Sequence, residues 1–487
     1  MSLLKKLVGQ TAIYGLSSIV GRLLNFLLVP LYTGIFAPEE YGIFSVIMTV
    51  VAFAMVVLTY GFETAFFHFT NKEEDSEKVL STGFISLLST SLLFLVLATF
   101  NSQYVANLLH VSEYPNFISW LVWILVLDVL TTLPFAKLRV DHRAWRFAFV
   151  RLVNIGVNIG LNLFFYLLCP YLLKQGFALN FVGSIYDPTM GIGYIFISNL
   201  IASAVMLLLL TPEIFKLKFS FDFAVWKKMW KYGFPLLIGG LAYVTNETAD
   251  KLLLKHLLPA DTATAQVGVY SACYKIAIFM SLFIQAFRYG AEPFFFALAQ
   301  KKDAKEQYAI VMRYFIAFTA FIFLSINVFI DIIKHFIQDE AYHAGLDVVP
   351  ILLLANLFLG MYYNLSVWYK VSEKTRFGAY LSLAGAAITI GLNILLIPTM
   401  SYMGSAWATL ICYASMCVMS YVFSRRHYPI SYNWKYISFY MISALSLFYI
   451  WTLWHDDHFI MSSLFCIIYI FSVVVLEKRK KISTFNL

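Results

Sequence analysis

The sequence predicts an all-α integral membrane protein. Its 487 residues are 61% hydrophobic and only 13% charged, and the mean hydropathy is +0.76. Soluble domains carry about 25% charged residues, so this composition excludes an ordinary soluble enzyme. The apolar runs continue over roughly the 20 residues that a helix needs to cross a bilayer, whereas a β-barrel would show alternating segments of about ten. Helices are therefore the expected spanning elements.

Taken in order, the apolar runs predict about 14 transmembrane helices. The first six cover residues 10–33, 41–64, 79–100, 115–134, 148–169 and 191–211. The next six cover residues 233–257, 266–287, 308–330, 346–368, 378–398 and 402–423, and the last two cover 435–454 and 459–476. Lys5 and Lys6 precede the first run, as in a signal peptide. Because no small-residue cleavage site follows and a second span begins soon after, we interpret this run as a membrane helix.

The basic residues of the connecting segments indicate the orientation. Cytoplasmic loops of membrane proteins carry an excess of Lys and Arg. With the N-terminus inside, only Lys174 and Lys334 fall on the outer side, and all other basic residues outside the predicted spans fall on the cytoplasmic side. One missed or invented helix would invert every later loop, so this asymmetry supports an even number of helices. Both termini are predicted to be cytoplasmic.

A short internal repeat predicts two lobes. Residues 41–45 (YGIFS) and 267–271 (VGVYS) each stand at the start of the second helix of a six-helix set, 226 residues apart. An even number of helices separates them, so both halves enter the membrane in the same direction. Parallel repeats of this kind are typical of transporters, in which the substrate cavity lies between two similar bundles.

These features divide the chain into an N-lobe (residues 1–215), a linker (216–232), a C-lobe (233–426), a helix pair (433–477) and a basic tail (478–487). The segment 212–232 carries five lysines interleaved with aromatic residues. One interpretation is a surface-lying amphipathic helix that holds anionic lipid headgroups. The other, which we favour, is a plain cytoplasmic linker.

Three cations inside predicted spans are candidate substrate ligands, namely Arg22, Lys251 and Lys275. A charge at the bilayer centre costs about 2.5–3.5 kcal/mol on insertion scales, so such residues usually face a wet cavity or a partner. Arg and Lys are natural partners of phosphate oxygens. We therefore predict that these three line a cavity and hold an anionic headgroup.

A structural role competes with this hypothesis on the seventh predicted helix. Glu247, Lys251 and Lys255 follow one another at i, i+4 spacing and share one face, with Asp250 beside it. The two carboxylates would then neutralise the two lysines locally. Alternatively, Lys255 extends its ammonium to the outer interface.

Acidic residues inside the spans are candidates for coupling to an ion. Glu63, Asp128, Glu247 and Asp250 would bind H⁺ or Na⁺ in one conformation only. Plain ion pairing is the alternative for each of them.

No motif indicates catalysis or a bound metal. The five cysteines lie scattered in apolar runs, without the spacing of a zinc site or a disulfide framework. Gly191 and Gly193 begin a hydrophobic span with no preceding strand, so they do not form a phosphate loop. The net charge of +8 is not gathered on one soluble face, and we expect no nucleic-acid partner. The sequence thus predicts a transporter without catalytic residues, cofactor or metal.

Two segments resemble the Wzx-type polysaccharide flippases of the MOP exporter superfamily. Residues 9–47 (GQTAIYGLSSIVGRLLNFLLVPLYTGIFAPEEYGIFSVI) form the first, and residues 245–276 (TNETADKLLLKHLLPADTATAQVGVYSACYKI) form the second. In the second, Asp250 and Lys251 followed by residues 267–270 stand where that family carries an acidic–basic pair and a Gly-aromatic turn. The resemblance extends over essentially the whole chain.

The resemblance implies a MATE-like fold whose two lobes form a V and alternate between inward-open and outward-open states. It implies a location in the bacterial cytoplasmic (inner) membrane and a cargo of undecaprenyl-diphosphate-linked oligosaccharide, for assembly of lipopolysaccharide O-antigen, capsule or exopolysaccharide. Expected partners are that cargo, membrane lipids, and the polymerase and glycosyltransferases of the pathway. The family's cationic cavity is carried over only to Arg22 and Lys251, because this chain has fewer unpaired basic residues than some members.

Other functions stay open. A lipid II flippase of the same fold would be enriched in arginines in the first, second and eighth predicted helices. This chain meets that expectation only in part, with Arg22. A MATE-type multidrug exporter usually has twelve helices and an acidic cavity, so the extra helix pair and the intramembrane lysines argue against it. A membrane-embedded glycosyltransferase would need a large outer loop rich in carboxylates, but the longest one, residues 170–190, holds only Asp187.

Overall fold

The computed structural model describes Gly15, Ser17 and residues 19–70, 76–176, 179–454 and 459–485. Within these residues the secondary structure is helical and contains no strand, which confirms the predicted all-α class. Residues 10–14, 16 and 18 of the first predicted helix and the last two residues of the predicted tail lie outside the described part. The chain divides into two compact units, Met1–Gly268 and Val269–Leu487, and each is described by itself.

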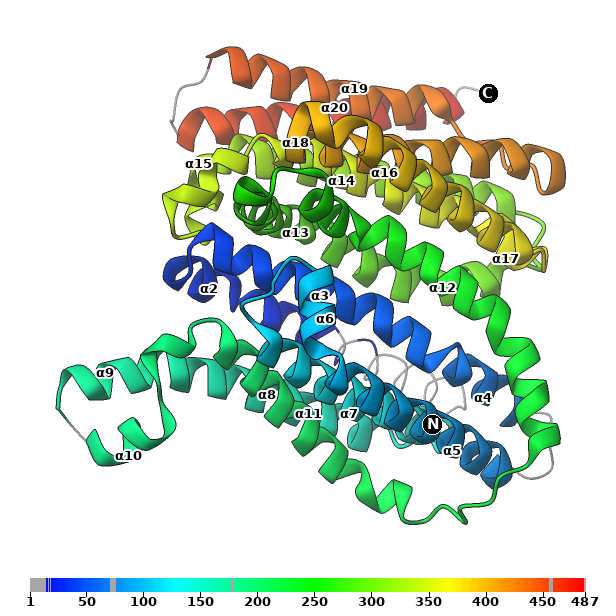
Figure 1. The fold of residues 1–487 in the computed structure, drawn as a ribbon. Coiled ribbons are helices and arrows are strands. Elements are labelled where there is room, and N and C mark those ends of the chain that lie inside the picture. Colours follow the sequence, from blue (N-terminus) through cyan, green and yellow to red (C-terminus); the bar gives the residue numbers. More distant parts are fainter. Residues whose placement is uncertain are drawn as a thin grey trace. The chain divides into compact units, whose positions relative to one another are not determined.

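The first unit contains the helices up to α12 (Figure 1). They are α2 (Val29–Ile35), α3 (Pro38–Thr59), α4 (Phe62–Thr70), α5 (Ser76–Phe100), α6 (Ser102–Leu108), α7 (Pro115–Val140), α8 (Ala144–Leu163), α9 (Cys169–Lys174), α10 (Leu179–Ile185), α11 (Gly193–Ile214) and α12 (Phe223–Leu257). A π-helical turn, η1 (Phe164–Leu168), joins α8 to α9, and a 3₁₀ turn, η2 (Pro188–Met190), precedes α11. The short helices α9 and α10 form an arm that projects from the unit (Figure 1).

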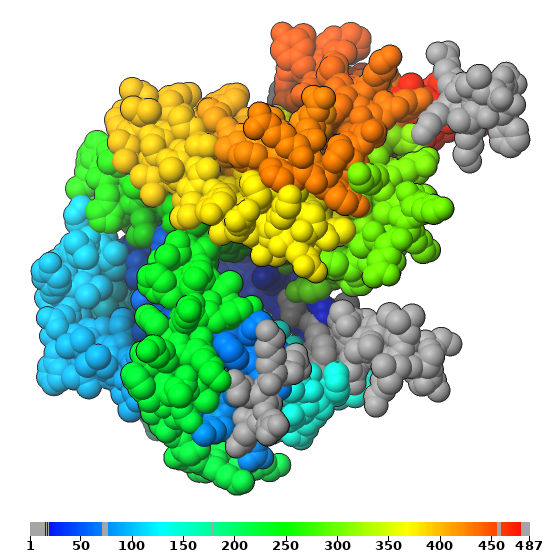
Figure 2. Space-filling model, turned by 90° about the vertical axis from the view of Figure 1, so that its right-hand side faces the viewer, coloured from blue at the N-terminus to red at the C-terminus, as the bar shows by residue number. Residues whose placement is uncertain are grey.

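The second unit contains most of α13 and all later helices. They are α13 (Ala260–Leu298), α14 (Ala304–Val328), α15 (Ile330–Ile333), η3 (Lys334–Phe336), η4 (Glu340–Gly345), α16 (Val348–Leu365), α17 (Val367–Val371), α18 (Arg376–His427), α19 (Trp434–Trp454) and α20 (Phe459–Phe485). Helix α16 packs on α18, and the yellow and orange parts of the chain that include them adjoin on the face shown in Figure 2. Helices α19 and α20 lie side by side and both contact α14.

Eleven of the described helices are long and apolar enough to span a membrane. One of them, α18, consists of two helices that meet at a kink at Ser401, where φ is +53°. Each of the two corresponds to one predicted span. Neither α12 nor the 17-residue stretch Ile19–Ile35 reaches the same length and hydropathy. Every predicted span therefore overlaps a helix, whereas the number of crossings stays a prediction.

Helix ends follow local chemistry. Pro38 occupies the first turn of α3, where the missing N–H costs nothing, and the Glu40 carboxylate accepts the Ala37 N–H at 3.3 Å. The helix stops at Tyr60, whose φ is +32°, and Gly61 follows with φ +74°. The predicted span at 41–64 is thus two helices, α3 and α4.

The repeated glycines pack helices against each other. A Cβ on Gly42 would lie 2.0 Å from the carbonyl oxygen of Thr264, and one on Gly268 would lie 1.8 Å from that of Pro38. Small residues let membrane helices approach backbone to backbone. Gly42 of the first copy and Gly268 of the second therefore meet where α3 crosses the start of α13, inside the first unit.

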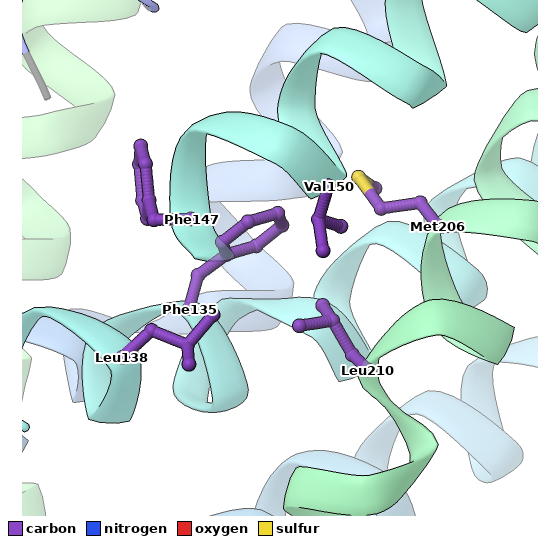
Figure 3. Packing of buried hydrophobic residues seen from close by; sticks show 6 residues of the cluster. All are labelled: Phe135, Leu138, Phe147, Val150, Met206 and Leu210. Carbon is purple, nitrogen blue, oxygen red and sulfur yellow. The ribbon is translucent and has the colours of Figure 1, made fainter. Parts of the chain in front are cut away.

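A buried cluster holds α7, α8 and α11 together (Figure 3). It consists of Phe135, Leu138, Phe147, Val150, Met206 and Leu210. Because lipid tails are as apolar as these side chains, close packing rather than the hydrophobic effect favours this contact. The cluster fixes the three helices that carry Asp128, Asn158 and Ser203.

Candidate functional site

Arg22 lies on the helical stretch Ile19–Ile35, and its side chain is exposed. The preceding residue, Gly21, faces α8, because a Cβ there would lie 2.7 Å from Ile155 Cδ1. This contact places Arg22 away from the α8 packing surface.

Lys251 lies on α12 and forms an ion pair with Asp250. Its ammonium Nζ lies 3.1 Å from Asp250 Oδ1, and its backbone N–H donates to the same oxygen at 2.9 Å. The Lys251 and Asp250 side chains are only 13% and 5% exposed. Glu247 lies one turn earlier and is half-buried. The structure thus brings three of the predicted site residues together on one helix.

The other two lysines differ from each other. Lys255 is buried and donates to the Thr264 hydroxyl of α13. Lys275 is half-buried on α13 and belongs to the second unit. Lys255 therefore has a structural contact within the first unit.

Glu63, at the start of α4, pairs with Arg139 near the end of α7. The guanidinium of Arg139 also lies over the ring of Phe67, 4.8 Å from its centroid. Both charged side chains are about a third or more exposed. This carboxylate therefore stands in an ion pair at a helix end.

Asp128 lies on α7 in a different environment. Its carboxylate accepts a hydrogen bond from Ser203 on α11, and the charge of Arg151 on α8 acts on it. The other carboxylate oxygen, Oδ1, is buried and has no hydrogen-bond partner among the described residues. A buried acceptor without a donor is costly, unless it takes up a proton or binds a ligand.

A chain of amide side chains continues from the helix that carries Ser203. Asn199 lies one turn before Ser203 and accepts from Asn158 Nδ2 at 3.3 Å. Asn158 Oδ1 accepts from Asn162 Nδ2 at 3.0 Å, and Asn162 Oδ1 accepts from the Tyr32 hydroxyl at 2.9 Å. We call this set the polar track; its members are Tyr32, Asp128, Arg151, Asn158, Asn162, Asn199 and Ser203.

The polar track is the feature that our sequence analysis missed. A signal was present, since Asn154, Asn158 and Asn162 recur at i, i+4 spacing in an otherwise apolar run. Asparagine is scarce in membrane helices unless it hydrogen-bonds across them. The partners on α2 and α11, however, are set by packing and cannot be identified from one sequence.

The residues present do not form a typical metal centre. Within the described part of the chain, no three His, Cys, Asp or Glu side chains lie together. The polar track offers one carboxylate with hydroxyl and amide groups. Such a set can exchange a proton at the carboxylate and stabilise its charge through neighbouring donors.

Comparison with known proteins identifies the family. A family model described as polysaccharide biosynthesis protein matches residues 33–337. The chain belongs to this family. The matched region includes Glu63, Asp128, Lys251 and Lys275, and it begins after Arg22. Among curated proteins, the comparison finds no match.

Solved structures share the fold of this polysaccharide biosynthesis protein. The lipid II flippase MurJ in an inward closed conformation matches with a TM-score of 0.76 and 15% identity, over 97% of this chain and 99% of that chain. An inward-facing multidrug resistance MATE family transporter of the MOP superfamily matches with a TM-score of 0.66 and 13% identity, over 83% and 94%. The MATE multidrug transporter DinF-BH matches with a TM-score of 0.61 and 16% identity, over 87% and 96%. The chain is therefore a multi-pass membrane protein with the MurJ and MATE fold.

Proposed function

We propose that this protein is a flippase that moves an undecaprenyl-diphosphate-linked oligosaccharide across the bacterial cytoplasmic membrane by alternating access. The observation that carries the proposal is the match of the polysaccharide biosynthesis family to residues 33–337, on a chain whose fold matches a transporter of the MOP superfamily. The oligosaccharide would serve O-antigen, capsule or exopolysaccharide assembly. Glycosyltransferases would supply the cargo and a polymerase would use it.

The proposed headgroup ligands are Arg22, Lys251 and, in the second unit, Lys275. A diphosphate carries oxygens that guanidinium and ammonium groups bind with charge-assisted hydrogen bonds. The exposed side chain of Arg22 supports its role, since a ligand can reach it. The pair with Asp250 holds the Lys251 ammonium in place, and an ammonium carries three N–H donors, so it can contact more than one partner.

Asp128 is the proposed coupling residue, with H⁺ as the coupling ion. Glu63 and Asp250 each form an ion pair with a cation, whereas Asp128 Oδ1 is buried without a hydrogen-bond partner in the described structure. Protonation removes the charge that burial penalises. The protonated and charged forms would then favour different conformations of the first unit, which is the requirement for coupling.

A proton-driven mechanism predicts how Asp128→Asn behaves. In vesicles with an imposed pH gradient, the wild-type protein should flip cargo faster than without the gradient, and Asp128→Asn should lose that acceleration. Asp141→Asn, at the exposed end of the same helix, is the matched control and should respond like wild type. If a Na⁺ gradient at constant pH accelerated flipping instead, Na⁺ rather than H⁺ would be the coupling ion.

Lipid II is the alternative cargo. The lipid II flippase matches 97% of this chain and the MATE transporter 83%, so we place lipid II before a drug as the alternative. Gene deletion distinguishes the two cargoes. If the oligosaccharide proposal holds, lipid-linked oligosaccharide accumulates on the cytoplasmic leaflet and surface glycan is lost, while lipid II is unaffected. Normal surface glycan in a strain without a redundant flippase would contradict it, and lipid II accumulation would support the alternative.

A further inference from the structure

The second unit contains a pocket of about 420 Å³ that the proposed transport mechanism does not use. It lies between the first turns of α14 and the connection from α18 to α19, residues 428–433. Its polar lining includes Lys302, Asp303, Lys305, Glu306, Arg313 and Ser431. We call it the α14 pocket.

The helix ends around the α14 pocket place it at one face of the membrane. Helix α13 ends at Leu298, α14 begins at Ala304, α18 ends at His427 and α19 begins at Trp434. Trp434 donates its indole N–H to the Tyr421 hydroxyl at 3.0 Å, and both rings contact Tyr432. Trp and Tyr gather at the level of lipid headgroups. A ligand in this pocket would therefore meet the protein at headgroup depth, on the side that the basic residues mark as cytoplasmic.

The lining carries charges of both signs. Lys302 and Lys305 are exposed cations, and Asp303 and Glu306 are exposed carboxylates next to them in sequence. An anion with no positive group would meet two repelling carboxylates, and a simple cation would meet two lysines. The pattern instead suits a ligand that itself carries a negative and a positive group.

Arg313 adds a buried donor to the pocket. Its side chain is 7% exposed, and Nη2 lies 3.1 Å from Oε2 of Glu477 on α20. The guanidinium Nε is buried and has no hydrogen-bond partner among the described residues. Arg313 lines the pocket while its guanidinium is paired with Glu477, so it adds positive charge to the pocket wall beside Lys302 and Lys305.

We propose that the α14 pocket binds the headgroup of a zwitterionic phospholipid with a primary ammonium group. The phosphate would interact with Lys302, Lys305 and Arg313, and the ammonium with Asp303 and Glu306. A choline headgroup has no N–H to donate to these carboxylates, and a glycerol headgroup has no positive charge. The ligand class is thus set by the paired charges and the depth of the pocket, and it is separate from the transported cargo.

A headgroup bound in the α14 pocket should also affect how α19 and α20 are attached to α14. Glu477 accepts from the Tyr440 hydroxyl of α19 as well as pairing with Arg313 of α14. One carboxylate thereby joins three helices directly beside the α14 pocket. A headgroup that orders Arg313 should strengthen this junction, so binding should raise the thermal stability of the protein.

The test uses the purified full chain in detergent, titrated separately with phosphatidylethanolamine, phosphatidylcholine and phosphatidylglycerol. The readouts are the unfolding temperature and the lipid retained in native mass spectrometry. Phosphatidylethanolamine should raise the unfolding temperature by several degrees and be retained preferentially. Lys302→Gln/Lys305→Gln should weaken its binding about tenfold, as expected for lost charge-assisted bonds. Asp303→Asn/Glu306→Gln should remove the preference over phosphatidylcholine.

Controls keep the outcome decisive. Lys174→Gln/Lys334→Gln removes the same charge from positions outside the pocket and should bind like wild type. Glu306→Gln alone serves if a double variant fails to fold. Equal shifts with all three lipids, or the largest shift with phosphatidylglycerol, would overturn the proposal. A full shift with inorganic phosphate or with soluble glycerophosphoethanolamine would assign the pocket to a free solute instead of a lipid.

Discussion

Lys251 and Asp250 are adjacent residues whose opposite charges are both nearly buried in α12. Removing one partner of a buried pair usually costs about 3–5 kcal/mol, because the other charge stays desolvated. A loss of transport after a single substitution therefore has two explanations, a lost ligand contact or a damaged helix. A neutral pair separates them.

We predict that Lys251→Ala lowers the unfolding temperature, whereas Asp250→Asn/Lys251→Gln restores most of it. If Lys251 contacts the cargo, the neutral pair should still flip less than about a tenth of the wild-type amount, the loss expected when a charged contact is removed. Unfolding in detergent and flipping in liposomes measure the two effects. Transport that returns together with stability would make the pair purely structural.

Asp222 caps α12 and pairs with another helix. Its carboxylate accepts the Ala224 and Val225 N–H groups at 2.8 and 3.1 Å, and Lys78 Nζ of α5 lies 2.6 Å from it. The hydrogen bond from Lys78, followed by those from the backbone, holds the pKa of Asp222 below its ordinary value. The carboxylate therefore stabilises the fold only while it is charged.

The sign of the pH dependence follows from this lowered pKa. The contribution of Asp222 is fully present above the pKa of the unfolded chain, about 3.9, and is lost as the pH falls through the lower folded value. Thermal unfolding measured between pH 3 and 7 should therefore decline more steeply for wild type than for Asp222→Asn below about pH 4. Parallel curves for the two proteins would show that Asp222 does not act in this way.

At the scale of helices, the contact between Gly42 and Gly268 leaves no room for a side chain. Backbone atoms rather than flexible side chains occupy the space, so they cannot move aside cheaply. Elsewhere, Gly239 on α12 has no neighbouring atom within 4 Å of a Cβ position. A substitution by alanine is therefore expected to have opposite effects on stability at Gly268 and at Gly239.

Gly268→Ala should destabilise the protein by at least the roughly 1–3 kcal/mol typical of overpacking, and we expect a low yield of folded protein. Gly239→Ala should be neutral or stabilise by up to about 1 kcal/mol, because alanine favours a helix. Yield after detergent extraction and unfolding temperature provide the comparison. Equal behaviour of both variants would contradict the close crossing of α3 and α13.

The pairing of Arg313 with Glu477 attaches α20 to α14. Arg313 is 7% and Glu477 21% exposed, so neither charge is well solvated. Glu477→Gln should cost about 3 kcal/mol and increase amide exchange in α19 and α20. Glu77→Gln, which breaks an exposed pair with Lys218, should cost under about 0.5 kcal/mol. Unchanged exchange in α19 and α20 would show that the pair does not hold them.

For the whole molecule, the apolar runs predicted the all-α class, and every predicted span overlaps a helix of the described residues, because the bilayer imposes length and hydropathy on a helix. Boundaries that depend on capping were less predictable. Helix α12 begins at Phe223 rather than near residue 233, since Asp222 caps it inside the predicted linker, and no separate surface helix lies between residues 215 and 222.

Hydrogen-bond and ion-pair partners on distant helices could not be predicted from one sequence. The Asn158–Asn199 bond and the Arg313–Glu477 pair join helices that are distant along the chain. Periodicity shows which residues share a face of one helix, but not which helix packs against it.

The central claim is that this chain flips a lipid-linked oligosaccharide. The most direct measurement reconstitutes the purified full chain into liposomes that contain undecaprenyl-diphosphate-linked oligosaccharide and follows the cargo that becomes accessible to a membrane-impermeant reagent. We predict accessibility that rises with time, falls sharply in Arg22→Ala, and exceeds that of lipid II in matched liposomes. Cargo that becomes accessible no faster than in protein-free liposomes would contradict the claim.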